Sequence, residues 1–404
     1  MDARPGWQPL RSQAGASGDA VALPSAFSRL VAAQALSCAG DTLVAVALAG
    51  SLFFDISPAA ARTRVALSLV LTMAPFAIVA PFLGPAIDRR RNGRRGTLVS
   101  AAAGRVLTCL VMARYLHGLL LFPVAFGSLV LSKAFGVAKS SLVPTTIADQ
   151  DDLIQANAKL AITAAVVGLA SAAPGILVLK TVGAPWVLRL AAAVLVAAAV
   201  AAGRVEQVSP DAGDGGAAAV EALHEAALRP AVLGTAALRA SVGFVTFATA
   251  FSLRRGGAPS WVFGLVLAAS MAGSFGGAVV APHLRRVVRE ERVLVLSLLA
   301  VAGTALVCSR WASRFTAGVL ALVLGACASA GKLAFDSLVQ REAPAAVQGR
   351  QFARFEAAFQ IVWVIGALVP TVVPIPLRVA FVIVGLVAAG AAVLPELQRR
   401  RNRS

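Results

Sequence analysis

Charged residues are scarce in this sequence. Asp, Glu, Lys and Arg together make up 14% of the 404 residues, while hydrophobic residues make up 58%. Soluble globular domains carry about 25% charged residues. The composition therefore excludes an ordinary water-soluble domain and indicates a chain whose outer surface meets lipid.

Cysteine and histidine are also few. The chain has four cysteines and three histidines, and the cysteines stand singly inside apolar segments, at Cys38, Cys109, Cys308 and Cys327. None of them has the Cys-x-x-Cys or Cys/His spacing of a zinc site or of a disulfide framework. We expect no bound metal and no cofactor.

Acidic residues are outnumbered by basic ones. The 19 Asp and Glu stand against 37 Lys and Arg, which gives a formal net charge of +18. Such a surplus can indicate nucleic-acid binding, but that function needs a basic soluble face, and the sequence offers no soluble domain. Instead, about 22 of the 37 basic residues fall on the side of the predicted termini, the bias typical of cytoplasmic loops. We expect both termini in the cytoplasm and no nucleic-acid partner.

Long apolar segments fill most of the chain. Each is long enough to cross a hydrocarbon core of about 30 Å, and in lipid such segments must be helices because their backbone groups have no water to bind. They predict an all-α polytopic membrane protein with twelve transmembrane helices, at 26–54, 63–87, 97–115, 119–146, 158–180, 184–203, 230–253, 260–283, 292–309, 314–340, 352–373 and 376–395.

The second half of the sequence repeats the first at an offset of about 197 residues. At this offset Pro85 aligns with Pro282 and Arg95 with Arg292. A steady offset indicates duplication of a six-helix unit, and two such units can enclose a central path across a membrane. The repeat predicts a transporter.

Polar stretches divide the chain into five predicted regions. They are a disordered cytoplasmic tail (1–25), an N-terminal six-helix bundle (26–203), a cytoplasmic linker (204–229), a C-terminal six-helix bundle (230–395) and a basic cytoplasmic tail (396–404).

A short motif lies between the second and third predicted helices. The run Gly84-x-x-x-Asp88-Arg89, followed by Gly93-Arg94-Arg95, resembles the signature loop of the major facilitator superfamily. Four residues separate Asp88 from Gly93, where the family usually has two. The resemblance implies the twelve-helix fold of two pseudo-symmetric bundles, and transport without enzymatic chemistry.

Two further stretches resemble the exporter branch of that superfamily, which includes siderophore and macrolide exporters. They are 39–42, with the sequence Ala-Gly-Asp-Thr, and 142–157, which contains Leu-Val-Pro and Leu-Ile-Gln-Ala-Asn. The resemblance implies that a small molecule is moved out of the cell by alternating access. It covers the chain from about residue 26 to 395.

The signature loop implies a conformational latch. Gly84 has no side chain, so a neighbouring helix can approach closely. Asp88 follows one turn later, where its carboxylate can face the positive N-terminus of another helix; the resemblance implies that this is the eleventh helix. We expect Gly84, Asp88 and Arg89 to hold the two halves together in one state and to release them in the other.

The arginines that end the signature loop have two interpretations. Arg94 or Arg95 could bridge to an acidic residue of the loop 149–152, or they could only fix topology and contact lipid headgroups. In the second half, Arg285 stands at the position that aligns with Asp88. The counterpart loop is therefore expected to lack the acid, and the latch to depend on the first loop.

Asp41 lies about halfway along the first predicted helix. A charge at that depth costs at least ~2.5–3.5 kcal/mol, so it needs an internal partner. Lys133 lies at a comparable depth, and Arg239 occupies nearly the repeat-equivalent position in the seventh helix. We predict a proton- or substrate-coupling site of Asp41 with Lys133 or Arg239; the alternative is a static ion pair. Arg105 is expected to snorkel or to brace the signature loop.

The few polar residues inside the predicted helices suggest a broad apolar cavity. Such a cavity suits a small amphipathic cargo, exported by proton antiport from a monomer in the bacterial cytoplasmic membrane. One alternative is a proton-coupled importer of a small metabolite or sugar, which usually has a more polar cavity. A non-transporting sensor or enzyme would need nucleophiles or metal ligands near an interface, and the sequence shows none.

Overall fold

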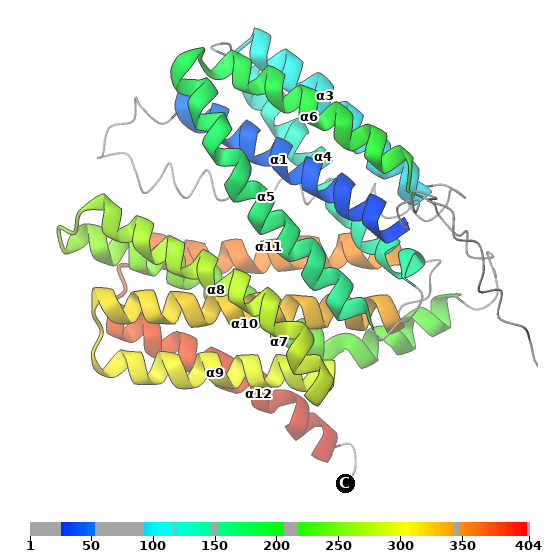
Figure 1. Ribbon diagram of the computed structural model, residues 1–404. Helices are drawn as coiled ribbons and strands as arrows, with labels where there is room; N and C mark the ends of the chain where they lie inside the picture. The colour runs from blue at the N-terminus through cyan, green and yellow to red at the C-terminus, as the bar shows by residue number, and fades with distance from the viewer. Residues whose placement is uncertain are drawn as a thin grey trace, which may run out of the picture.

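The computed structural model describes residues 26–52, 93–116, 118, 120–147, 152–205, 217–342 and 348–401. Within these ranges the secondary structure is helical, and the helices run roughly along one another in two groups (Figure 1). The predicted tail at 1–25 and the predicted second helix at 63–87 lie outside the described residues.

Eleven helices are described. The first group comprises α1 (Ala26–Leu52), α3 (Gly93–Arg114), α4 (Leu121–Thr146), α5 (Leu153–Thr181) and α6 (Ala184–Gly203). The second comprises α7 (Ala217–Arg255), α8 (Ser260–Val287), α9 (Glu290–Arg310), α10 (Arg314–Glu342), α11 (Gln348–Val372) and α12 (Leu377–Arg401).

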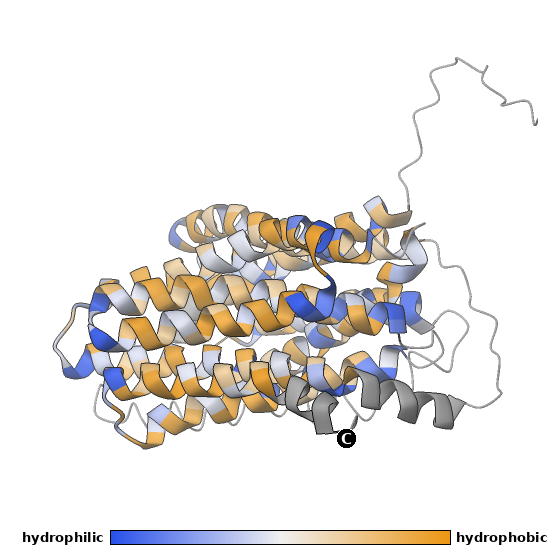
Figure 2. Ribbon diagram, turned by 90° about the horizontal axis from the view of Figure 1, so that it is seen from below, coloured by the Kyte–Doolittle hydropathy of each residue, from blue (hydrophilic) through white to orange (hydrophobic). Residues whose placement is uncertain are grey.

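Ten of these helices contain a stretch long and apolar enough to cross a membrane, and α12 has a shorter apolar stretch at Leu377–Val393. Large apolar side chains also lie on their outer faces, such as Leu169 at 76% exposure and Phe315 at 80%. Figure 2 shows hydrophobic residues along the length of the helices. An apolar surface of this kind is stable only against lipid, so the chain is a multi-pass membrane protein.

Several helices are longer than the sequence pattern predicts. The seventh was expected from residue 230, but α7 begins at Ala217 and continues through Pro230. The third was expected from residue 97, but α3 begins at Gly93. Polar first turns carry no hydropathy signal, so the apolar pattern detects only the part of each helix that lies in lipid.

The helices of the two groups have corresponding packing partners. In the first group, α1 packs against α5 and α6, and α3 packs against α4 and α6. In the second, α7 packs against α11 and α12, and α9 packs against α10 and α12. Each of these four contacts of the first group thus recurs six helices later, which is the arrangement that a duplicated six-helix unit would produce.

The two groups meet through α4 and α5 on one side and α8, α10 and α11 on the other. Near one end of the molecule Ile154 and Ala158 of α5 are buried against Ala281 of α8 and Ala334 of α10. We call this the closed end, and define it by the start of α5 and the end of α10. It joins the halves by a small apolar interface that can separate without unfolding either bundle.

Glycines allow unusually close packing of α8 on α10. A Cβ atom added at Gly277 would come well inside contact distance of the Ala326 backbone, and one at Gly325 would collide with the backbone of Ser270. Because both obstacles are backbone atoms, no side-chain rotation can relieve them. Adjacent Gly276 faces open space, with no atom within 4 Å of an added Cβ.

This contrast predicts opposite effects of the same substitution at neighbouring positions. Gly277→Ala should destabilise the folded protein by about 1–3 kcal/mol, because overpacking forces α8 away from α10. Gly276→Ala should be neutral or slightly stabilising, since alanine favours a helix. Thermal unfolding of the purified variants in detergent tests this, and equal unfolding temperatures would contradict the close packing.

Candidate functional site

A central cavity lies between the two halves. One part, of about 290 Å³, is bordered by α1, α4, α10 and α11. An adjoining part, of about 340 Å³, extends between α4, α5, α7, α8 and α10. Both parts are lined by Gln34, Lys139, Ser140, Lys332 and Asp336.

The walls of this cavity are strongly charged. The 290 Å³ part is lined by six ionisable side chains in addition to Cys38, namely Asp41, Lys133, Lys139, Lys332, Asp336 and Glu356. The expectation of a broad apolar cavity is therefore wrong. Average hydropathy concealed these residues because each helix carries only a few charges, and they lie on the face turned away from lipid.

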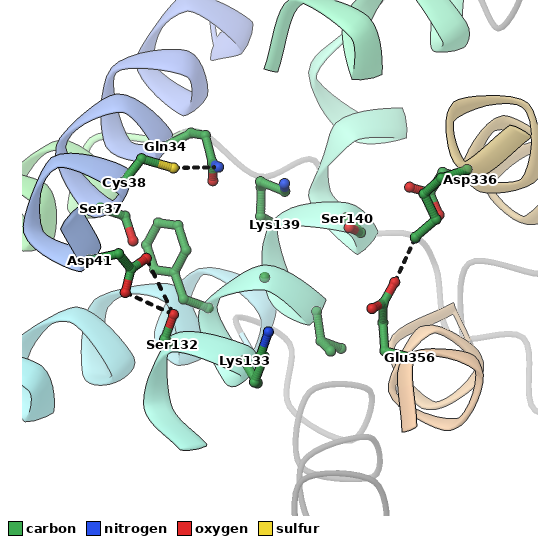
Figure 3. Close-up of a pocket in the computed structure, with 14 residues that line it drawn as sticks. Gln34, Ser37, Cys38, Asp41, Ser132, Lys133, Lys139, Ser140, Asp336 and Glu356 are labelled. Carbon is green, nitrogen blue, oxygen red and sulfur yellow. Dashed lines mark hydrogen bonds and ion pairs between the residues drawn. The ribbon is translucent and has the colours of Figure 1, made fainter. Parts of the chain in front are cut away.

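Asp41 of α1 projects into the cavity, and Arg105 of α3 contacts it from the side away from the cavity. The Arg105 Nη2 atom lies 2.5 Å from Asp41 Oδ1, and Arg105 Nη1 donates a hydrogen bond of 2.9 Å to Ser37. Ser132 of α4 donates to the same carboxylate at 3.1 Å. The Arg105 side chain is 1% exposed and that of Asp41 46%, so the cation is sealed while the carboxylate is open to the cavity. Figure 3 shows the Asp41 carboxylate beside Ser132.

Within the described part of the chain, Asp41 forms its ion pair with Arg105, whereas the sequence suggested Lys133 or Arg239. Arg105 also does not snorkel, because its guanidinium group is buried against Asp41 and Ser37 of α1. Lys133 lines the 290 Å³ part of the cavity and Arg239 the adjoining part.

A second ionic cluster stands on the opposite wall. The Lys332 Nζ atom lies 2.5 Å from Asp336 Oδ1 and 2.5 Å from Glu356 Oε1. Lys332 and Asp336 are one turn apart on α10, while Glu356 comes from α11. Two carboxylates thus share one ammonium group. We refer to Lys332, Asp336 and Glu356 as the α10–α11 triad.

Aromatic packing fixes the two helices of the triad relative to each other. The ring of Phe335 lies 5.3 Å from that of Phe355 and 5.0 Å from that of Phe359, edge-to-face in both cases. Phe335 and Phe359 are almost fully buried. Such contacts each stabilise by about 0.5–1.5 kcal/mol beyond the burial of their area, so α10 and α11 present the triad as a unit.

Sequence reasoning singled out Asp41 but did not single out Lys332. Asp336 was missed, although an acid four residues after Lys332 in an apolar helix is a recognisable signal. The role of Glu356 was also missed, because it lies close to the start that the sequence predicts for the eleventh helix, at residue 352. In the structure α11 begins four residues earlier, at Gln348, and Glu356 lines the cavity.

A hydrogen-bonded clamp joins the halves at the closed end. Asn157 of α5 donates a hydrogen bond of 2.6 Å to the side chain of Gln340 on α10. Gln340 in turn donates to the carbonyl oxygen of Ser140 on α4 at 2.9 Å. Asn157 and Gln340 are 8% and 3% exposed, so their bonds are shielded from competing water.

Three of the residues predicted for the latch lie outside the described part of the chain: Gly84, Asp88 and Arg89. The other two begin α3. Arg94 is buried and donates a hydrogen bond of 3.0 Å to the carbonyl oxygen of Ser141 on α4. Arg95 donates to the carbonyl oxygen of Gly203 at the end of α6. Both arginines therefore tie helix ends together within the first half.

In the second half, the corresponding helix ends are joined by ion pairs. Glu290, at the start of α9, accepts a hydrogen bond of 2.7 Å from Arg285 of α8 and one of 3.3 Å from Arg341 of α10. Arg285 stands at the position aligned with Asp88, but the loop does have an acid, Glu290, five residues beyond it. The offset comparison missed it because only the position aligned with Asp88 was considered.

The chain belongs to the Major Facilitator Superfamily, whose family model matches residues 30–367. Its fold resembles that of a bacterial homologue of the iron transporter ferroportin in an outward-facing state, with 15% identity and a TM-score of 0.68 over 92% of this chain and 97% of that one. It also resembles the transporter FucP in the outward conformation, with 14% identity and a TM-score of 0.69 over 92% and 98%. The proton:xylose symporter XylE gives 13% identity and a TM-score of 0.68 over 91% and 94%.

Among curated proteins, the chain is 27% identical over 381 residues to an uncharacterized protein of Mycobacterium leprae, covering 84% of this chain and 66% of that protein. It is 36% identical over 129 residues to an uncharacterized protein of Mycobacterium tuberculosis, covering 30% of this chain and 23% of that protein. The chain thus spans less than two-thirds of the length of these relatives.

The asymmetric burial of the Asp41–Arg105 pair predicts asymmetric mutational effects. Asp41→Asn leaves a sealed guanidinium group without its carboxylate, and should cost about 2 kcal/mol, less than the roughly 3–5 kcal/mol of a fully buried pair. Arg105→Met leaves a carboxylate that faces the cavity, and should cost less. Unfolding of the two single variants and the double variant, measured in detergent, gives the coupling; additive losses would mean that the pair contributes nothing.

Proposed function

We propose that this protein is a proton-coupled secondary transporter that moves a small polar or charged solute by alternating access. The observation that carries the proposal is the charged cavity between two bundles that are joined at one end. A membrane interior stabilises such a cavity only if its charges have partners or bind solutes. Rocking of one bundle against the other would then expose it to each side in turn.

The conformation is best explained as the outward-facing state. If both termini are cytoplasmic, as the distribution of Lys and Arg indicates, the closed end faces the cytoplasm. The clamp of Asn157 and Gln340 then seals the cytoplasmic side. We propose that the signature loop, with Gly84, Asp88, Arg89, Arg94 and Arg95, stabilises the same state.

The α10–α11 triad is the strongest candidate for carrying the proton. With all three groups ionised, Lys332, Asp336 and Glu356 have a net charge of −1, so one proton makes the cluster neutral. The Asp41–Arg105 pair is already neutral, and a proton would leave a net positive charge in a medium that solvates it poorly. Charge balance therefore favours proton uptake on the triad.

Asp41 remains the second candidate for coupling. Its carboxylate is exposed to the cavity and reaches Ser132 of α4, so protonation would weaken one contact between α1 and α4 and one between α1 and α3. Lys133, one residue beyond Ser132, lines the same part of the cavity. We propose that Asp41, Ser132 and Lys133 respond to the bound solute and couple solute binding to the position of α1.

Two transport directions follow from different observations. The resemblance to the exporter branch favours efflux of a small compound, such as a drug, siderophore or secondary metabolite, by proton antiport. The charged walls of the cavity favour a polar solute and therefore make proton-coupled uptake the second candidate. Proteoliposomes distinguish them, since an imposed proton gradient drives solute in opposite directions for symport and antiport.

Neutralising the triad should separate proton coupling from solute exchange. For a solute found by screening proton flux in proteoliposomes, Glu356→Gln should reduce gradient-driven accumulation at least about tenfold, while exchange of labelled for unlabelled solute continues. Asp41→Asn provides the comparison. If accumulation persists in Glu356→Gln and fails only in Asp41→Asn, the proton is carried by Asp41 and not by the triad.

Loss of the clamp should open the closed end. Gln340→Ala removes the bonds to Asn157 and Ser140, each worth about 0.5–1.5 kcal/mol, and should shift the population toward the state open at that end by about tenfold. Distances between spin labels on the ends of α5 and α10 would report the shift. Thr371→Ala is the matched control, because its buried hydroxyl bonds only within α11; an equal shift in this control would contradict the assignment.

A further inference from the structure

Two cations in the central cavity form no direct ion pair with the described residues, although both lie within the electrostatic reach of the triad carboxylates. Among the residues that the structure describes, neither Lys139 of α4 nor Arg239 of α7 makes an ion pair or a hydrogen bond through its side chain. By contrast, Arg105 is paired with Asp41, and Lys332 with two carboxylates. A charge inside a membrane protein is costly unless it is paired, so an unpaired cation in a cavity is a sign that its partner arrives from outside.

The two side chains come from opposite halves and border the same space. Both Lys139 and Arg239 line the 340 Å³ part of the cavity. Figure 3 shows Lys139 extending from α4 into the space between the α1 residues and Asp336. Polar groups that can donate hydrogen bonds surround them, from Ser140, Asn157, Ser270, Ser274 and Ser329.

Positive charge predominates among the described residues that line the cavity. Its lining, together with Arg105 behind Asp41, holds five basic side chains and three acidic ones. The 340 Å³ part has three basic lining residues, Lys139, Arg239 and Lys332, and among the described residues one acid, Asp336. An incoming anion would therefore meet an attractive field that the fixed acids do not cancel.

We propose that the transported solute is a small organic anion, whose carboxylate or phosphate group binds between Lys139 and Arg239. This inference rests on the proposed transport function and names the class of its substrate. The guanidinium of Arg239 can bind an oxyanion through two parallel hydrogen bonds, and the ammonium of Lys139 completes its neutralisation. Because one cation belongs to each bundle, the bound anion draws the two walls of the open cavity together.

The native Cys38 provides a test that needs no knowledge of the solute. Its thiol lines the 290 Å³ part of the cavity together with Lys139, whereas Cys109 and Cys308 are buried in the bundles. Two thiol reagents of similar size, the anionic sulfonatoethyl and the cationic trimethylammonioethyl methanethiosulfonate, would be reacted with the purified full-length protein. Mass spectrometry of the Cys38 peptide gives the ratio of the reaction rates of the two reagents. A change in the reactivity of the thiol itself affects both rates equally and leaves this ratio unchanged.

The anionic reagent should react faster with Cys38, relative to the reaction of both reagents with a free thiol. Lys139→Gln and Arg239→Gln should each lower this preference at least about tenfold, the effect of removing one nearby charge at an effective dielectric constant of about 20. Lys139→Arg and Arg239→Lys, which keep the charge, should restore it. Arg189→Gln is the control, because Arg189 lies on α6 against the ring of Trp186 and does not line the cavity.

A rate ratio that favours the cationic reagent, or one that Lys139→Gln and Arg239→Gln leave unchanged, would overturn the proposal. The charge-keeping variants separate loss of charge from loss of fold, since a misfolded variant would also expose Cys109 and Cys308 to both reagents. The assay measures no transport. If proteoliposomes show no proton-coupled flux while the anion preference holds, the proposed function fails and the anion site stands.

Discussion

The cost of placing a charge in a membrane is the constraint on which the rest of this structure depends. It explains why the ionisable side chains of the helices gather around one central cavity, and why most have a partner there. It also explains the form of each cluster: Arg105 is sealed behind Asp41, and Lys332 stands between Asp336 and Glu356. A rearrangement of the helices that separated these partners would have to replace them with water, protons or a solute.

The fold was predictable because it depends on properties that a sequence displays directly. Apolar length indicated the membrane helices, and the signature loop at Gly84 and Asp88 indicated the superfamily, to which the family match assigns the chain. Asp41 was predictable as a candidate functional residue because a charge halfway along a membrane helix needs an internal partner. Its partner was not, because the side chain that reaches Asp41 from a different helix depends on how the helices pack. In the structure that side chain is Arg105 of α3.

The polarity of the cavity was missed for a related reason. Hydropathy averages over all faces of a helix, whereas a cavity is lined by one face of each of several helices. α10 has a strongly apolar candidate span, yet Lys332 and Asp336 fall on the same side, one turn apart. Periodicity within the helix would have revealed that pair, but only packing could show that Glu356 of α11 joins it. Likewise, only the packing of the helices shows that Lys139 and Arg239 form no direct ion pair with the described residues.

The two halves share a packing pattern but not a charge pattern, and this difference bears on the direction of transport. The first half contributes a neutral pair and additional lysines, while the second contributes a triad with excess negative charge.

An anion bound at Lys139 and Arg239 would lie near that triad and favour its protonation, and by linkage the proton would favour the anion. Cargo and proton would then bind together, which is the condition for symport. Antiport instead requires that the cargo and the proton exclude each other, as a cationic cargo and a proton do. The sign of the cargo's charge therefore decides between the two directions.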